Sequence, residues 1–194
     1  MEKIGAQDIL PLGEYEKIRE DSRRRIREIK KWRRLLVGDY ISILFENRET
    51  VIHQIQEMIR AEQIKDPIRL QEEIDAYNSL IPDHGELSST LFIEIEEQER
   101  IKEILDSLMG IDEIGIVYIQ IEEKIKIPAI FEKGRSKEDK ISAVHYVRFK
   151  FNEAEKKAFL DTSIPVYLII DHPNYKAEAA IGHATRKELG TDLS

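Results

Sequence analysis

Residues 114–132 read IGIVYIQIEEKIKIPAIFE. Two apolar runs rich in isoleucine, 114–121 and 125–132, flank a polar tripeptide at 122–124. Two such runs separated by a short polar turn are typical of an antiparallel β-hairpin. Pro128 has no backbone N–H to donate, so the second strand is expected at a sheet edge or at a bulge. The hairpin therefore predicts an antiparallel sheet at the centre of the fold.

The rest of the chain surrounds this hairpin with further strands and with helices. Alternating or apolar runs predict strands over 40–46, 87–96, 141–151, 165–171 and 175–181. Helical spacing of apolar residues predicts a long helix over 14–36 and shorter helices over 49–63, 67–77, 98–109, 153–160 and 184–189. Helices and hairpin-like strands without steady βαβ alternation favour an α+β fold, with a mainly antiparallel sheet or open barrel of about six to seven strands.

No Pro/Gly-rich linker divides the 194 residues. We therefore expect residues 1–194 to form a single α+β domain, helix-rich over about 1–85 and strand-rich over about 86–194. An acidic residue stands early in the chain and no long apolar run follows, so we expect neither a signal peptide nor a membrane helix. The expected location is therefore cytoplasmic.

The charge is distributed unevenly along the chain. The net charge is −8, yet residues 22–34 contain eight Lys or Arg and a single acidic residue. Such a segment is consistent with nucleic-acid binding, with pairing to acidic segments such as 94–113, or with a contact in a homodimer. Trp32, its one aromatic residue, lies on the apolar stripe of the predicted helix, so nucleic-acid binding is expected to be weak.

Cysteine is absent. This excludes disulfides, thiolate nucleophiles and the usual thiolate ligation of zinc or iron–sulfur clusters. Neither the Glu-x-x-His pairs of di-iron bundles nor His-Glu-x-x-His is present. We accordingly expect no resident metal or other cofactor.

Two histidines have alternative interpretations. Glu49, His53 and Glu57 follow one face of a predicted helix, and such a row can bind a divalent metal ion. More often it is a solvated face with weak pairing between neighbours. His145 shares a strand face with apolar residues, which favours a hydrogen-bonded core histidine over a ligand.

The densest group of polar residues lies where the predicted strand 40–46 passes into the next helix. This candidate pocket comprises Glu46, Arg48, Gln54, Glu57, Arg60, Tyr77 and Glu86. Binding sites concentrate at such strand and helix ends. A junction held by Arg–carboxylate pairs is the competing interpretation, and the spacing alone favours it. Within the group, we assign a structural role to Arg60 and expect Glu57 to line a pocket.

Several segments of the chain carry a family resemblance. They are DILPL (8–12), LFENR (44–48), QIQEMIRAE (54–62), GELS (85–88), ISAVHYVRF (141–149) and DHPNY (171–175). In this order they resemble an uncharacterised bacterial family, domain of unknown function 3501, over nearly the whole chain. Such proteins are typically encoded beside a rubrerythrin and an iron–sulfur oxidoreductase. The resemblance thus implies an accessory role in a redox or peroxide-defence system.

Two hypotheses for function follow. In the first, the protein is a non-enzymatic partner of an iron–sulfur oxidoreductase or a rubrerythrin. In the second, it is a small-molecule-binding protein or enzyme with a polar pocket at the 46–60 strand–helix junction. A deep, water-accessible pocket there would favour the second hypothesis, whereas a filled junction and an exposed apolar patch would favour the first.

Overall fold

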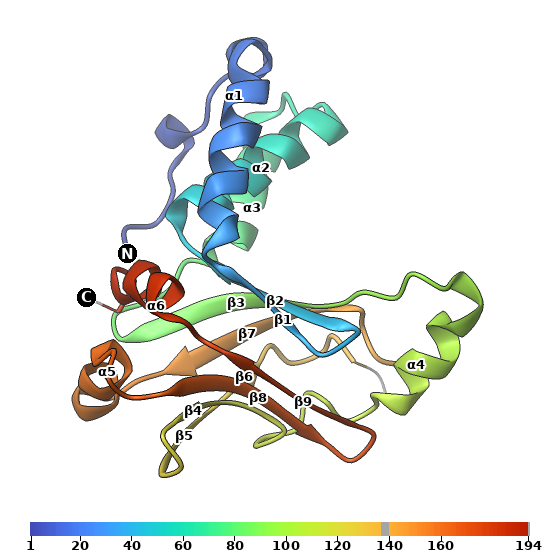
Figure 1. Cartoon of the computed structure of the whole chain (residues 1–194). Coiled ribbons are helices and arrows are strands. Elements are labelled where there is room, and N and C mark those ends of the chain that lie inside the picture. The colour runs from blue at the N-terminus through green and yellow to red at the C-terminus, as the bar shows by residue number, and fades with distance from the viewer. Residues whose placement is uncertain (137–139, 194) are drawn as a thin grey trace.

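The computed structural model describes residues 1–136 and 140–193. Within these residues, nine strands form two antiparallel sheets that pack face to face, and a helical arm projects from one of them (Figure 1). The predicted α+β class is confirmed. The strands divide into two sheets, however, instead of forming the expected single sheet or open barrel.

The five-stranded sheet has the order β1-β2-β3-β7-β6, and the four-stranded sheet has the order β5-β4-β8-β9. The first contains β1 (Arg34–Val37), β2 (Ile41–Glu46), β3 (Glu86–Ile93), β7 (Val144–Lys150) and β6 (Ile130–Phe131). The second contains β5 (Ile125–Pro128), β4 (Val117–Ile121), β8 (Val166–His172) and β9 (Tyr175–Ala180). The predicted hairpin is confirmed as β4–β5, and Pro128 lies on its edge strand. After Ala129 the chain crosses to the other sheet, where β6 pairs with β7.

The arm consists of α1 (Leu12–Lys31), α2 (Arg48–Glu62) and α3 (Pro67–Asn78). Three shorter helices lie around the sheets: α4 (Ile101–Ser107), α5 (Glu153–Leu160) and α6 (His183–Gly190). Two 3₁₀ turns complete the described elements, at Ala6–Asp8 and Gln98–Arg100. No helix in the described ranges is long and apolar enough to cross a membrane.

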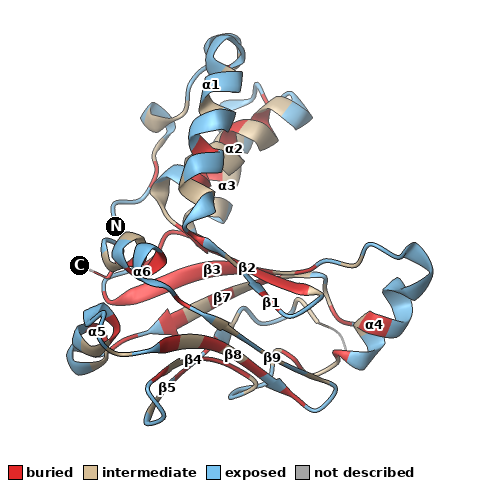
Figure 2. Cartoon of the chain, viewed as in Figure 1, coloured by how far each residue is buried: buried red, intermediate tan, exposed pale blue. Residues whose placement is uncertain are grey.

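Two separate clusters of buried apolar side chains stabilise the molecule. The larger lies between the sheets and includes Ile43, Phe45, Leu87, Ile119, Val147 and Leu168. The smaller lies within the arm and includes Val51, Ile55, Ile59, Ile74 and Ile81. Figure 2 shows buried residues concentrated on the strands, whereas much of α1 and α4 is exposed. The arm therefore has a core of its own, next to the sheet that supports it.

The predicted helix over 14–36 is wrong at its C-terminal end. The helix ends at Lys31, and the chain continues as the edge strand β1, in which Leu36 is 71% exposed. The Arg33 side chain turns inward and donates to the carbonyl oxygens of Phe45 (2.9 Å) and Glu46 (3.3 Å). These acceptors lie far along the chain, so local helical spacing gives no sign of them.

Two further expectations are corrected. The nearly continuous apolar run at 165–171 predicts a strand buried on both faces, but Tyr167 and Ile169 of β8 are partly exposed while its alternate residues are buried. The residues after the predicted helix 184–189 are expected to fray, but Asp192 and Leu193 are buried. Local periodicity reports neither the partly exposed face of β8 nor Arg33, the distant partner that pairs with Asp192.

The DHPNY segment joins the two sheets at one end. Nε2 of His172 donates to the carbonyl oxygen of Met109 (2.9 Å), because Nδ1 already accepts from the backbone N–H of Asn174. The Tyr175 hydroxyl donates to the carbonyl oxygen of Val37 (2.6 Å), beside the β1–β2 turn. Gly38 in this turn has φ of +73°, and a Cβ there would lie 2.3 Å from the Tyr175 hydroxyl. This turn therefore requires glycine for both backbone and space.

A buried ion pair fixes the C-terminus to the base of the arm. The Arg33 guanidinium is fully buried and pairs with the buried carboxylate of Asp192 and, at 3.0 Å, with Glu188 on α6. Burial raises the pKa of Asp192, although the positive charge of Arg33 acts in the opposite direction. Removing one member of such a pair leaves an uncompensated buried charge.

We expect Asp192→Ala to lower the free energy of unfolding by about 3–5 kcal/mol, because Arg33 loses its buried counter-charge. Chemical denaturation monitored by circular dichroism measures this loss. Glu188→Gln is the matched control: it removes the other carboxylate from the same guanidinium, but Glu188 is partly exposed, so the expected loss is below about 1 kcal/mol. Equal losses for the two variants would contradict the assignment.

Candidate functional site

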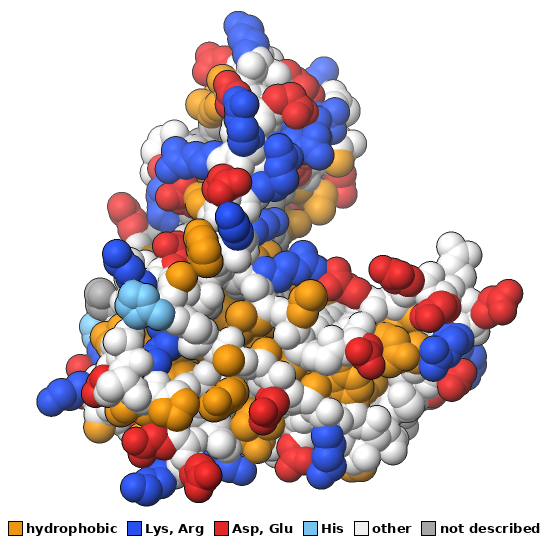
Figure 3. Space-filling model, in the orientation of Figure 1, with side chains coloured by type: hydrophobic (Ala, Val, Ile, Leu, Met, Phe, Trp, Pro, Cys, Tyr) orange, Lys and Arg blue, Asp and Glu red, His pale blue; other side chains and the backbone are white. Residues whose placement is uncertain are grey.

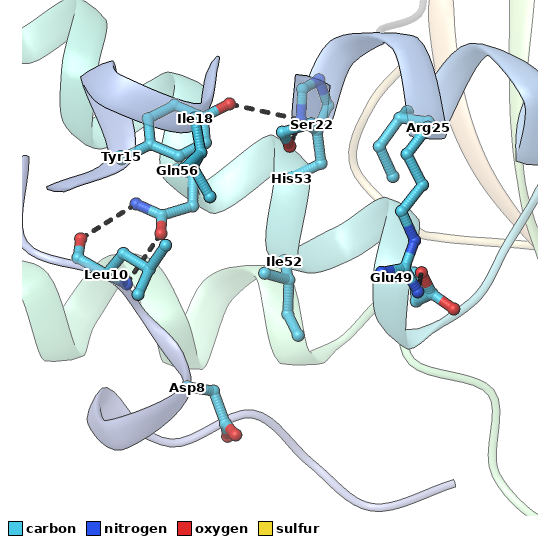
Figure 4. A pocket seen from close by; sticks show the side chains of 11 residues that line it. Asp8, Leu10, Tyr15, Ile18, Ser22, Arg25, Glu49, Ile52, His53 and Gln56 are labelled. Carbon is cyan, nitrogen blue, oxygen red and sulfur yellow. Dashed lines mark hydrogen bonds and ion pairs between the residues drawn. The ribbon is translucent and has the colours of Figure 1, made fainter. Parts of the chain in front are cut away.

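An open cleft of about 450 Å³ lies between α1, α2 and the N-terminal segment that precedes α1 (Figure 4). We call it the α1–α2 cleft. Its lining residues are Asp8, Leu10, Tyr15, Ile18, Ser22, Arg25, Ile26, Glu49, Ile52, His53 and Gln56. The cleft thus adjoins the same helix, α2, that carries most of the residues predicted from the sequence.

The N-terminal segment is held on α2 by polar contacts. The Gln56 amide accepts from the backbone N–H of Leu10 (2.7 Å) and donates to the carbonyl oxygen of the same residue (3.2 Å). Two residues earlier, the Asp8 carboxylate pairs with Arg48 at 2.7 Å. A hydrogen bond from the Gly5 backbone, and then the Arg48 guanidinium, lower the pKa of Asp8. The segment DILPL is therefore one wall of the cleft.

Behind the cleft, Glu57 joins α2 to α1. Arg19 donates to its two carboxylate oxygens, from Nε to Oε1 and from Nη2 to Oε2, both at 2.8 Å, and the buried Tyr15 hydroxyl donates to Oε1 at 2.7 Å. These hydrogen bonds, Arg19 first, lower the pKa of Glu57 to about 2. Burial, followed by the hydrogen bond to Glu57, raises the pKa of Tyr15 to about 12. At neutral pH this is a fixed pair of a carboxylate and a neutral phenol.

His53 lies between the two helices with few strong contacts. Its Nδ1 is 3.3 Å from the Tyr15 hydroxyl and 3.5 Å from Ser22 Oγ. Burial lowers the pKa of His53, so the imidazole is neutral at pH 7. The serine–histidine distance is long for an activated nucleophile, which needs about 2.6–3.2 Å. Ser22 and His53 therefore lack the close contact of an activated serine–histidine pair in this structure.

The row of Glu49, His53 and Glu57 does not form a ligand set. Glu49 pairs with Arg25 at 2.6 Å, and Glu57 pairs with Arg19. Across residues 1–136 and 140–193, no group of three His, Asp or Glu side chains is placed to hold a metal ion. The Arg25–Glu49 pair and the pair of Arg34 with Glu94 (2.6 Å) show that part of the positive charge of residues 22–34 is paired within the molecule, one of the alternatives considered for this segment.

Two members of the predicted pocket meet under the arm. The buried Glu46 carboxylate accepts hydrogen bonds from Thr50 (2.5 Å), Thr90 (2.8 Å) and the Gln54 amide (3.0 Å). Asn47 caps α2 at the same point through the backbone N–H of Thr50. The strand–helix junction is therefore filled by its own hydrogen bonds.

The other members are distributed over separate places. Arg48 and Glu57 support the walls of the α1–α2 cleft, as described above, and Arg60 forms an ion pair with Glu16 (2.8 Å). Tyr77 lines a second cleft of about 460 Å³ between α3 and β7, together with Tyr146 and Arg135. Glu86 pairs with Arg148 on the neighbouring strand β7. The structure thus joins Glu46 to Gln54, whereas Tyr77 and Glu86 have other partners.

Residues preceding position 27 were absent from the predicted pocket, yet they supply seven of the eleven residues that line the α1–α2 cleft. Tyr15 and Ile18 belong to the apolar stripe of the predicted long helix, which marks them as buried against a neighbour but not as lining a cleft. Asp8 and Leu10 belong to the DILPL segment of the family resemblance. That segment was the one signal in the sequence that could have identified them.

The sequence predicts that His145 is a buried core residue and that it is hydrogen-bonded; the structure confirms the burial and contradicts the hydrogen bonding. It is a core residue, 1% exposed, whose ring meets Phe131 edge-on at a centroid distance of 5.5 Å. It was expected to be hydrogen-bonded, but neither ring nitrogen has a hydrogen-bond partner among the described residues. Burial lowers the pKa of His145. The neutral ring is thus a packing group, which protonation would destabilise.

Comparison with known proteins agrees with this picture of an α+β protein with two antiparallel sheets and a helical arm. The chain matches the family model described as "Protein of unknown function (DUF3501)" over residues 3–193 and belongs to that family. It is also similar to a solved structure from Burkholderia pseudomallei K96243, titled as a novel protein of unknown function. The identity is 31%, the TM-score is 0.91, and 100% of each chain is covered. No curated protein matches the chain.

The ion pairs of α2 give a first prediction for this site. Glu57→Gln should lower the free energy of unfolding by about 1–3 kcal/mol at pH 7, because Arg19 loses a bidentate charged acceptor. The loss should diminish as the pH falls from 4.5 towards 2, where the wild-type carboxylate itself becomes protonated.

The control for this experiment is Arg60→Ala, which breaks a more exposed pair and should cost below about 1 kcal/mol. This order is the reverse of the roles expected from the sequence, where Arg60 was the structural residue. Thermal melts at several pH values measure both variants. An equal or larger loss for Arg60→Ala would refute the order given by the geometry.

The second prediction concerns acid sensitivity. Because the pKa of His145 is lowered in the folded state, its neutral form contributes stability that is lost as the pH falls below about 6.5, by up to about 1.4 kcal/mol per pH unit. His145→Leu should flatten the dependence of unfolding free energy on pH between about 6.5 and 5. His53→Gln, at a half-buried site, should flatten it less. An unchanged slope in His145→Leu would contradict the assignment.

Proposed function

We propose that the protein is a non-catalytic accessory protein that binds a redox-protein partner, an iron–sulfur oxidoreductase or a rubrerythrin, through the α1–α2 cleft. The observation that carries the proposal is that charged groups around the cleft are already paired with one another. Asp8 pairs with Arg48, and Arg25 pairs with Glu49. A charged metabolite would have to displace these pairs in order to bind.

The apolar side chains of the cleft favour a protein segment as its occupant. Leu10 and Ile18 are 37% and 45% exposed, and Ile52 lines the same cleft. Isoleucine and leucine side chains exposed along a groove between two helices are the usual contacts for the apolar face of a docked segment. Such surfaces release water when covered, which supplies most of the driving force for association.

The choice of partner rests on the family resemblance and on the residue types of the chain. The resemblance implies genes encoded beside a rubrerythrin and an iron–sulfur oxidoreductase. A chain without cysteine has no thiolate with which to hold an iron–sulfur cluster in the usual way. If this chain acts together with those proteins, binding to them is therefore better supported than electron transfer through a cluster of its own.

The alternative, a small-molecule site at the 46–60 junction, has less support. Glu46 is buried and already accepts from three donors of the same chain. A ligand at that point would have to replace these hydrogen bonds, which leaves buried polar groups unpaired if the replacement is incomplete.

Isothermal titration with the purified oxidoreductase and rubrerythrin of the same organism tests the proposal. Ile18→Glu should weaken binding to the true partner at least about tenfold, because it places a charge in the apolar cleft. Ile68→Glu is the matched control, since Ile68 is 70% exposed on α3 and does not line the cleft. Absence of binding to both proteins, or equal weakening by the two variants, would refute the proposal.

A further inference from the structure

A further concave surface lies between the arm and α4. Figure 3 shows this face hollowed, with Lys and Arg side chains on the arm, acidic side chains towards α4, and apolar side chains between them. The hollow includes a groove of about 750 Å³, which we call the β1 groove. Its lining residues are Leu36, Asp39, Tyr40, Glu94, Ile95, Glu96 and Glu97.

The β1 groove combines an apolar floor with an acidic rim. Leu36, Tyr40 and Ile95 form the apolar part, and Leu36 extends from an edge strand that pairs only with β2. A large apolar side chain that is 71% exposed beside an unpaired strand edge is a feature of interaction surfaces.

The rim retains negative charge that the molecule does not neutralise. Arg34 neutralises Glu94 at 2.6 Å, and Glu97 has only a long contact of 3.9 Å with Arg100. In the described part of the chain, Asp39 and Glu96 form no ion pair. The groove therefore fits an occupant that is both apolar and basic.

The same chain carries such a segment at the end of α1. Arg27, Lys30 and Lys31 make no ion pair with any described residue, in contrast to Arg19 and Arg25 earlier on the helix. Next to them, Trp32 is 46% exposed, and Lys31 Nζ lies 5.3 Å from the centre of its ring. Exposed tryptophan beside basic residues is typical of an anchor in a protein interface.

Within one molecule, this anchor is separated from the groove that would receive it. Leu36 follows Trp32 by four positions, a span of at most roughly 13 Å at about 3.3 Å per residue. Both are fixed in place, since Arg33 between them is buried in its ion pair. In an isologous interface the same surface of each copy faces the other, so a two-fold axis beside β1 would place the anchor of each copy against the groove of its partner.

We propose that the protein forms a two-fold symmetric homodimer in which the basic segment 27–32 of each protomer, with Trp32 as its anchor, occupies the acidic-rimmed β1 groove of the other. Leu36 lies near the axis in this arrangement. The β1 groove shares no lining residue with the α1–α2 cleft. The dimer and the proposed partner binding are therefore tested independently.

Sedimentation equilibrium over a wide range of protein concentration tests the dimer. The wild-type chain should shift from 22.7 kDa towards twice that mass as its concentration rises, and salt should weaken the association. Leu36→Glu should raise the dissociation constant at least about tenfold, whereas Ile68→Glu should leave it unchanged. Because Leu36 and Ile68 are both strongly exposed, neither variant is expected to disturb folding, which circular dichroism verifies.

Charge reversal distinguishes this interface from other modes of self-association. Lys31→Glu and Glu96→Lys should each weaken the dimer, and the double variant should recover affinity because the reversed charges again face each other. A wild-type monomer at every concentration would overturn the proposal and leave the groove for a basic segment of another protein. A dimer that is insensitive to Leu36→Glu, or single reversals that the double variant does not rescue, would overturn it as well.

Discussion

The buried Arg33 guanidinium is the constraint on which the arrangement of the molecule depends. It lies between the end of α1 and the start of β1, and it satisfies carbonyl oxygens at the end of β2 while it pairs with Asp192 near the C-terminus. A buried charge of this kind permits few alternatives, because any displacement leaves a charge or a carbonyl oxygen without a partner. One side chain thereby fixes the direction in which the arm leaves the sheet and holds the last residues of the chain against its base.

A second constraint follows at the face of the sheet beneath the arm. Alternate residues of β2 and β3 present polar side chains there, and Ser42, Glu46, Ser88 and Thr90 are all buried. Buried polar groups require hydrogen-bond partners, which the arm supplies in part through Thr50 and Gln54. The contact between the arm and the polar face of β2 and β3 thus explains the polar residues at the 46–60 junction.

Sequence reasoning succeeded where the determinants are local and failed where they are distant. The β4–β5 hairpin and the starts of α3 at Pro67 and of α5 at Glu153 agree with the sequence because each rests on residues within a few positions. The division into two sheets, the strand β1 and the burial of Asp192 depend on contacts across the whole chain. For the same reason, polar residues grouped because they lie on or beside predicted strand and helix ends, such as Glu57 and Glu86, were assigned to one pocket, although the fold directs them to different partners. His145 shows a further limit, because strand alternation places it in the core but says nothing about its hydrogen bonds.

Helix α1 connects the two proposed surfaces. Its first half contributes Tyr15 and Ile18 to the α1–α2 cleft, and its C-terminal end forms most of the basic segment 27–32. Because the β1 groove and the α1–α2 cleft share no lining residue, the proposed dimer would present two equivalent clefts for binding. Two sites held at a fixed separation bind an oligomeric or repeated partner more tightly than one site can, provided that the spacing of the partner matches. Under the proposed function, such a dimer would hold two partner molecules at a defined distance from each other.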